Sequence, residues 1–278
     1  MCLIAFAIDA SARWPLLIAS NRDEALARPT APLAAWISPA GNTILSGRDL
    51  RDGGAWLGVS SRRRVAMLTN VRIGPSGPGS RSRGGLVTGW LDAQSGIDEL
   101  CEAMQLRQNA ADYGGFNLVT GDLATGQWHW VTNTWQGSLG ALHIAALLQG
   151  VYGLSNAGLD TPWPKTLKLK QALTDQLNAP DFESLVQAML PALQDRCAAP
   201  AELLPHTGIG VEREVALSSP FVSLPGYGTR CSAVIALAAP DATRTQQLSF
   251  AELTYGEAST GSATTLPTAQ RRNEQLRW

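Results

Sequence analysis

The chain has 278 residues, of which 45% are hydrophobic and 16% are charged. This is the composition of an ordinary globular protein that is long enough to bury a sizeable core. The formal net charge of −1 provides no general field that would favour binding to nucleic acid or to an anionic membrane surface.

The N-terminal third of the sequence predicts short strands. Residues 2–8 (CLIAFAI) and 15–20 (PLLIAS) are continuous apolar runs separated by turn residues, which predicts a β-hairpin buried on both faces. The polar stretch 21–24 (NRDE) then stands at the expected end of the second strand. Segment 71–85 is rich in Gly, Pro, Ser and Arg and predicts a mobile loop. Further strands are expected at 43–46, 56–60 and 64–70.

The remainder of the chain alternates between groups of helices and groups of strands. Apolar spacing predicts helices over 85–107, 163–177 and 181–195, the last with Asp181 as its N-cap. Strands are expected at 115–120, 127–132, 151–155, 231–238 and 247–255. This order lacks a βαβ alternation, so it predicts an α+β protein with mainly antiparallel sheets covered by helices. We expect one domain over 1–278, with residues 262–278 as a flexible tail or peripheral segment.

Cysteine and histidine usage restricts the chemistry. Cys2, Cys101, Cys197 and Cys231 are far apart and form no C-x-x-C motif, so neither a zinc knuckle nor a thioredoxin motif is expected. The three histidines are isolated, and no metal site is predicted. The N-terminus lacks the features of a signal peptide, and no apolar stretch is long enough to span a membrane. These observations favour a cytoplasmic protein with reduced thiols, without integral membrane association and without a nucleic-acid partner.

Cys2 is the residue with the most distinctive chemistry. If Met1 is removed, Cys2 carries both a thiol and a free α-amine, with ordinary pKa values of about 8.5 and about 8 respectively. One residue then holds a nucleophile and a base, which suits covalent acyl transfer. The alternative is that Cys2 is a small apolar residue that begins a buried strand.

An N-terminal thiol nucleophile needs charged and hydrogen-bonding companions. Arg22 and Asp23 supply a cation and a carboxylate at the expected end of the second strand. Asn70 and Asn156 follow two further apolar strands and are candidate oxyanion donors. Arg230 adds a cation beside a Gly-rich turn. Asn21, Arg22 and Glu24 are candidate binding residues around the same position.

The ordered motifs of the chain resemble those of the NRDE-domain proteins, the family of transport and Golgi organisation protein 2. The family-like stretches are SNRDE at 20–24, GGAWLG at 53–58, LTN at 68–70, SRG at 82–84, YGLSNAGLDTPWPK at 152–165 and GYGTR at 226–230. This family in turn resembles N-terminal-nucleophile hydrolases of the bile-salt hydrolase and penicillin V acylase type. The resemblance implies a four-layer α-β-β-α sandwich.

The resemblance also implies roles for individual residues. Cys2, Asp23, Asn156 and Arg230 match catalytic positions of those hydrolases, and Asn70 matches less closely. The hydrolases carry the pattern R-N-x-D, whereas here Ser20 occupies the arginine position and Arg22 directly precedes Asp23. Adjacent residues of a strand point to opposite faces, so Arg22 and Asp23 cannot both face Cys2 unless the strand ends or bulges there.

Two functions follow from these observations. The first is an N-terminal-cysteine amidohydrolase that cleaves a C–N amide bond of a small molecule and requires no cofactor. The second is a non-catalytic protein that binds and carries haem, acyl-CoA or another lipid in the same cavity. The nine tryptophans suit an apolar pocket as well as an ordinary core, and His129 is the candidate axial ligand for haem.

Overall fold

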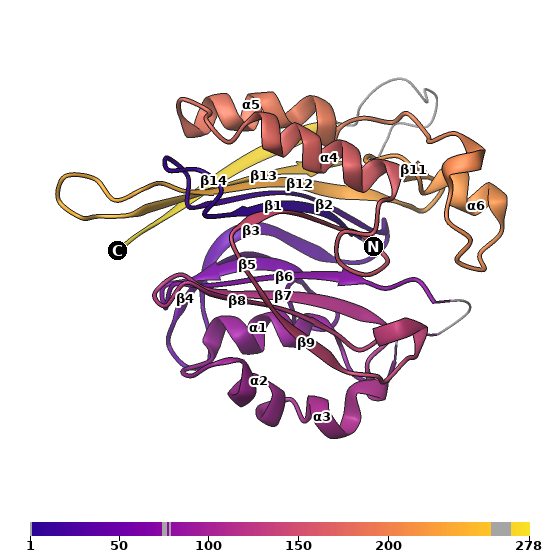
Figure 1. Ribbon diagram of the computed structural model, residues 1–278, viewed down its shortest axis with the longest axis horizontal. Helices are drawn as coiled ribbons and strands as arrows, with labels where there is room; N and C mark the ends of the chain where they lie inside the picture. The colour runs from indigo at the N-terminus through magenta and orange to yellow at the C-terminus, as the bar shows by residue number, and fades with distance from the viewer. Residues whose placement is uncertain (1, 74–76, 78, 257–267) are drawn as a thin grey trace. The chain divides into compact units, whose positions relative to one another are not determined.

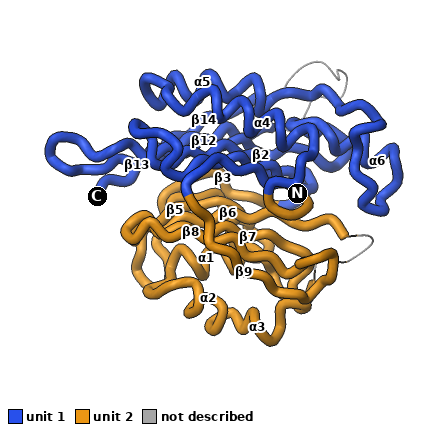
Figure 2. Tube along the Cα trace, viewed as in Figure 1, with its two compact units in different colours: residues 1–28, 149–154, 160–278 blue, residues 29–148, 155–159 orange. Residues whose placement is uncertain are grey.

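The computed structural model describes residues 2–73, 77, 79–256 and 268–278. Contacts divide the chain into two compact units, shown in blue and orange in Figure 2. Unit 1 contains residues 1–28, 149–154 and 160–278, and unit 2 contains residues 29–148 and 155–159. Each unit consists of one antiparallel sheet and the helices that pack on it (Figure 1).

The sheet of unit 1 has the strand order β10-β1-β2-β12-β13-β14, and the short β11 pairs with β12. Every neighbouring pair is antiparallel. The strands are β1 (Cys2–Ile8), β2 (Leu16–Ala25), β10 (Gly150–Leu154), β11 (Ser223–Leu224), β12 (Tyr227–Leu237), β13 (Gln247–Tyr255) and β14 (Ala269–Arg277). The N-terminal hairpin thus lies at the centre of this sheet, with β10 on one side and β12 on the other.

Helices cover one face of the unit 1 sheet. Helix α4 (Pro164–Asp175) packs on β1, and α5 (Phe182–Leu193) packs on β2 and β12. Between them lies a core of alternate strand residues, including Leu3, Ala5 and Leu17, with the helical Leu169 and Met189. Side chains of the other parity, including those of Cys2 and Arg22, therefore lie on the opposite face of the sheet. The remaining helical segments of this unit are η3 (Ala201–Leu203) and α6 (Val211–Ala216).

The sheet of unit 2 runs in chain order from β3 to β9. Its strands are β3 (Thr30–Ile37), β4 (Thr43–Asp49), β5 (Leu57–Ser60), β6 (Arg64–Asn70), β7 (Phe116–Asp122), β8 (Gln127–Thr132) and β9 (His143–Leu147). Helix α1 packs on this sheet with Trp90 fully buried. The helical segments are α1 (Gly84–Asp92), α2 (Ile97–Ala103), α3 (Leu106–Asn109), η1 (Ala110–Asp112) and η2 (Trp135–Gly137).

The predicted α+β class with antiparallel sheets is confirmed, and most predicted strands lie within two residues of their observed positions. Two local predictions are wrong. The polar stretch 21–24 does not end its strand, because β2 continues to Ala25. The helix expected over 85–107 is divided, since α1 ends at Asp92 and Gln105 has a left-handed φ of 53°. Of the segment expected to be a flexible tail or peripheral segment, the described residues include strand β14, which pairs with β13 along its whole length at the end of the strand order.

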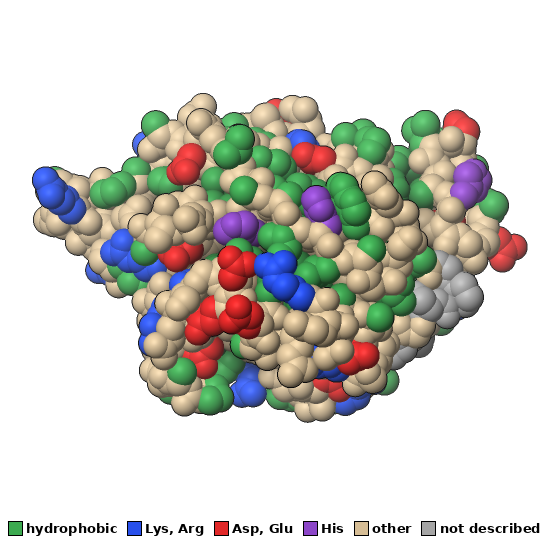
Figure 3. Space-filling model, turned by 60° about the horizontal axis from the view of Figure 1, so that its bottom comes forward, with side chains coloured by type: hydrophobic (Ala, Val, Ile, Leu, Met, Phe, Trp, Pro, Cys, Tyr) green, Lys and Arg blue, Asp and Glu red, His purple; other side chains and the backbone are tan. Residues whose placement is uncertain are grey.

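The surface carries charges of both signs. Acidic and basic side chains are both present on the face drawn in Figure 3, among scattered apolar ones. Within the described ranges, no helix is long and apolar enough to cross a membrane.

Candidate active site around Cys2

Cys2 begins the first strand of unit 1, and Arg22 lies directly opposite it on β2. Directly opposed residues of an antiparallel pair have their side chains on the same face, so the guanidinium and the thiol share one face of the sheet. The exposed fractions of Cys2 and Arg22 are 7% and 4%. The strand therefore brings a buried cation to the thiol.

Burial and neighbouring charges act in opposite directions on the Cys2 thiol. Desolvation by burial raises its pKa, and the negative charge of Asp23 raises it further, whereas the positive charge of Arg22 lowers it. Burial is the largest of these influences, so the pKa of the Cys2 thiol lies above its ordinary value, although the N-terminal charge also lowers it. A reaction at Cys2 consequently needs a base that removes the proton as the sulfur attacks.

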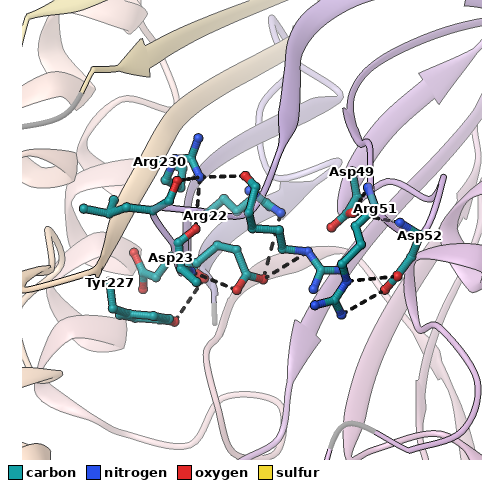
Figure 4. A network of polar contacts seen from close by, with 11 residues as sticks. Arg22, Asp23, Asp49, Arg51, Asp52, Tyr227 and Arg230 are labelled. Atoms are coloured by element: carbon teal, nitrogen blue, oxygen red, sulfur yellow. Dashed lines mark hydrogen bonds and ion pairs between the residues drawn. The ribbon is translucent and has the colours of Figure 1, made fainter.

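Asp23 follows Arg22 along a strand that neither ends nor bulges, so the expected alternation of faces holds. Its carboxylate accepts a hydrogen bond from Thr229 Oγ1 at 2.7 Å. Its carbonyl accepts one from the Tyr227 hydroxyl at 3.0 Å (Figure 4). The carboxylate is 1% exposed, and burial raises its pKa. Asp23 thus lies at the same end of the sheet as Cys2, as predicted, but on the face that Arg22 does not occupy.

Lys165 is a functional candidate that the sequence reasoning missed. This lysine of α4 is 3% exposed, and its Nζ donates to the Leu217 carbonyl at 2.9 Å. Its charge is the largest influence that lowers the pKa of Asp23 against the effect of burial. Lys165 is the last residue of the motif YGLSNAGLDTPWPK, so a signal was present, but a lysine at a helix start ordinarily predicts a solvated side chain.

Arg230 lies at a β-bulge of β12. The register shifts between Thr229, which faces Asp23, and Cys231, which faces Arg22, so Arg230 is the extra residue. Its Nη1 donates to the carbonyls of Ala25, Leu26 and Arg28, each at 3.0 Å (Figure 4). These three hydrogen bonds fix the backbone at the end of β2 and just beyond it. A role in supporting charge at Cys2 stays a prediction.

Asn21 and Glu24 differ in what they contact. The Asn21 amide faces the helices, where Nδ2 donates to the carbonyls of Leu193 at 2.7 Å and Pro220 at 2.9 Å. Asn21 Oδ1 accepts from the Ser232 hydroxyl at 2.6 Å. These bonds give Asn21 a structural use, and its proposed ligand contact stays a prediction. Glu24 is partly exposed, and its Oε2 lies 3.9 Å from Arg22 Nη2, so it is a partner for the Arg22 charge.

Asn70 and Asn156, the predicted oxyanion donors, are joined within unit 2. Asn156 Nδ2 donates to the Asn70 carbonyl at 2.9 Å, and the Asn156 carbonyl accepts from the Arg72 N–H at 2.8 Å. Asn156 is fully buried. The structure therefore brings these two residues together, and their role toward Cys2 of unit 1 stays a prediction.

A second buried thiol shares the face of Cys2 and Arg22. Cys231 lies opposite Arg22 on the other side of β2, and its thiol is hydrogen-bonded to the buried Glu252 of β13. Burial, with Glu252 as the next cause, raises the pKa of Cys231 well above its ordinary value. Arg22 is thus flanked by two buried thiols on one face of the sheet.

Two observations on the described residues concern a metal ion and haem. Across the described ranges, no group of three or more His, Cys, Asp or Glu side chains is placed to hold a metal ion. His129 of β8 has the same parity as Val131, which belongs to the packed core between sheet and helices. Burial lowers the pKa of His129. A side chain directed at a helix-covered face does not fit an axial haem ligand, so no step of the mechanism is assigned to haem.

Comparisons with known proteins agree with the motifs. The Transport and Golgi organisation 2 family matches residues 1–257. The human Transport and Golgi organization protein 2 homolog is 33% identical over 252 residues, which are 84% of this chain and 88% of the relative. The mouse Transport and Golgi organization 2 homolog is 35% identical over 207 residues, 70% of this chain and 72% of the relative.

A solved structure extends the comparison to the fold. The Caenorhabditis elegans N-acylethanolamine-hydrolyzing acid amidase ortholog superposes with a TM-score of 0.50 at 12% identity, over 84% of this chain and 92% of that protein. That protein is of the N-terminal-nucleophile hydrolase type, so the expected fold class is confirmed. The family match covers residues 1–257, and relatives more than 30% identical to the chain cover most of its length. The chain therefore belongs to the Transport and Golgi organisation 2 family.

Proposed function

We propose that this protein is an N-terminal-cysteine amidohydrolase that cleaves a C–N amide bond of a small acylated molecule. The observation that carries the proposal is the register that sets Arg22 opposite Cys2 while Asp23 lies beside it at the same strand end. The fold supports a hydrolase of this general kind, and the raised pKa of the Cys2 thiol requires a base. The α-amine of Cys2 itself, freed when Met1 is removed, is that base.

The reaction then proceeds through a thioester. The α-amine takes the thiol proton as sulfur attacks the amide carbonyl, and Arg22 offsets the developing charge on sulfur. The C–N bond breaks when the α-ammonium returns its proton to the leaving amine. Water then attacks the thioester with the α-amine as base, which releases the acid and restores the thiol. Asp23 holds the α-ammonium between these steps.

Hydrolysis of N-acylethanolamines is the first assay, because the structural neighbour is named for that substrate. A panel of fluorogenic N-acyl amides with different chain lengths extends it to other leaving amines. Wild type is expected to release the free acid, and Cys2→Ala is expected to release none. Cys197→Ala is the matched control, because Cys197 is an exposed cysteine outside the site. Equal turnover by wild type and Cys2→Ala would overturn the proposal.

Binding without catalysis is the second candidate function. The observation that favours it is the burial of the Cys2 thiol, which raises its pKa. If Met1 is retained, Cys2 has no free α-amine to activate that thiol. Saturable quenching of tryptophan fluorescence by acyl-CoA, without hydrolysis by protein whose Cys2 amine is free, would support this function. Hydrolysis by that same preparation would reject it.

A further inference from the structure

The last strand of unit 1, β14, forms an edge of the sheet. Among the described strands its neighbour in the sheet is β13, and β14 stands at the end of the strand order. The strand lies beyond residue 257, where the match to the family ends. An edge strand presents a row of backbone N–H and C=O groups that can pair with another strand.

This edge lacks the irregularities that usually protect edges. The β13–β14 register runs without a shift from the pair Gln247–Arg277 to the pair Tyr255–Ala269. The nine-residue sequence AQRRNEQLR contains no proline, and most of its side chains are exposed. Its charged residues are therefore the feature that decides which strands can pair with it.

We propose that β14 is a homodimerisation edge, at which two copies pair antiparallel about a two-fold axis through Asn273. A two-fold axis normal to the sheet leaves every side chain on the face of the sheet where it already lies. Directly opposed residues of the two copies must share a face, so the axis must pass at a residue and not between two residues. The register centred on Asn273 overlaps the two strands along their full length, Ala269 opposite Arg277. The result is one sheet that continues across both copies.

Charge complementarity selects the same register. Centring on Asn273 sets Arg272 opposite Glu274 of the second copy, and the symmetry repeats this pair. Centring on Arg271 or Arg272 would instead set that arginine opposite itself, and centring on Glu274 would set two glutamates together. Opposite charges that face each other across a strand pair stabilise it, and like charges destabilise it.

The neighbouring arginine does not oppose this arrangement. Arg271 points to the helical side, where Nη1 and Nη2 donate to Glu183 Oε1 at 2.7 Å and Oε2 at 2.6 Å. This bidentate pair lowers the pKa of Glu183 to about 2. In the proposed register Arg271 faces the neutral Gln275 of the second copy, so no like-charged residues are directly opposed.

A charge-reversal cycle on the full chain tests the proposal. Sedimentation velocity is run from about 1 µM to about 100 µM, because an interface made by a single pair of strands is small and associates weakly. Wild type is expected to dimerise. Arg272→Glu and Glu274→Arg are each expected to raise the dissociation constant about tenfold or more, since both symmetric pairs become repulsive. The double variant restores opposite charges and is expected to dimerise as wild type does.

Three outcomes would overturn the proposal. They are a wild type that stays monomeric across this range, single variants that dimerise like wild type, and a double variant without recovery. A wild-type monomer that binds a different protein through β14 also counts against it, because the proposed partner is a second copy. The recovery of the double variant separates loss of pairing from loss of folding.

Cross-linking tests the position of the axis. Opposed residues have Cα atoms about 4.5–5.5 Å apart, within the range of a disulfide, so Asn273→Cys is expected to form a disulfide between copies. Gln275→Cys is the matched control, because the two copies of residue 275 would lie about 13 Å apart along the strands. Both are made with Cys197→Ser, which removes an exposed thiol. Equal cross-linking of the two variants, or none with Asn273→Cys, would overturn the proposed register.

Discussion

Arg22 lies directly opposite Cys2 across the β1–β2 pair, with both side chains on the face of the sheet that the helices of unit 1 do not cover. Asp23, the next residue, is held by Thr229 and by the charge of Lys165. The side chains of Arg22 and Asp23 thus lie on opposite faces of β2. The Arg22 side chain shares the face of the Cys2 thiol, and the Asp23 carboxylate lies on the helical side, where it accepts from Thr229.

Removal of the Arg22 charge should slow reaction at Cys2. Arg22→Gln is expected to raise the pKa of the Cys2 thiol further, because the Arg22 charge lowers it in the wild type. The midpoint of the pH profile for alkylation of Cys2 should move to higher pH, and kcat/KM for hydrolysis should fall about a hundredfold. Arg28→Gln is the control, because it removes a cation that pairs with Glu24, at 4.0 Å, and not the cation that lies opposite Cys2. An unchanged alkylation profile would show that Arg22 does not act on the thiol.

Lys165 should stabilise the folded protein through its contact with the Leu217 carbonyl and its charge near the buried Asp23 carboxylate. Lys165→Met removes the cation that opposes the effect of burial on the Asp23 pKa and leaves the Leu217 carbonyl without its donor. Breaking a buried ionic contact typically costs about 3–5 kcal/mol, so we expect a loss of this order in the free energy of unfolding, measured with urea. Lys168→Met should cost less than about 1 kcal/mol, because Lys168 forms an exposed ion pair with Asp195. Equal losses for the two variants would contradict the role of Lys165.

Asp23 should make the protein less stable as the pH rises. Burial raises its folded-state pKa above the ordinary value of 3.8, so between these two values the folded state binds more protons than the unfolded state. The free energy of unfolding therefore falls as pH increases through this window, and Asp23→Asn should remove that slope. Urea unfolding of both proteins at a series of pH values measures it. A slope of the same size in Asp23→Asn would assign the effect to another group.

Asn21 should matter for stability more than for ligand binding. Asn21→Ala leaves the buried carbonyls of Leu193 and Pro220 without their donor. We expect a loss of about 2–4 kcal/mol in the free energy of unfolding, because several buried polar groups lose their partners. Asn109→Ala is the control, since its amide bonds only to the exposed Gln105. A fully stable Asn21→Ala protein with a raised KM would instead favour the ligand contact that the sequence predicted.

Most of the apolar strands could be predicted from the sequence, but the apolar β3 and β9 and the polar β14 were not among the predicted strands. Residues 2–8, 64–70, 127–132 and 247–255 are the strands that their hydrophobic patterns predict. The hydrophobic pattern predicts that the second strand ends at Ser20, but long-range hydrogen bonds such as those of Asn21 allow its polar residues to continue the strand inside the sheet. Strand β14 was missed for a related reason, because an exposed edge strand needs no apolar alternation.

The residue types of the site could be predicted, but not their mutual geometry. Cys2, Arg22 and Asp23 were found because their chemistry is distinctive and they are close in sequence. Which of Arg22 and Asp23 faces Cys2 depends on the register between β1 and β2. The place of Cys231 depends on a bulge in β12, and Cys231 is 229 residues along the chain from Cys2. Register is fixed by tertiary packing, so a single sequence does not reveal it.

The most direct measurement is intact-mass spectrometry of the purified protein, before and shortly after mixing with an N-acylethanolamine that it hydrolyses. We predict a mass that lacks Met1, followed by an acyl adduct that peptide mapping assigns to residue 2 and that is absent from Cys2→Ala. A chain that retains Met1 while hydrolysing the substrate, or an adduct on another residue, would contradict catalysis by an N-terminal Cys2.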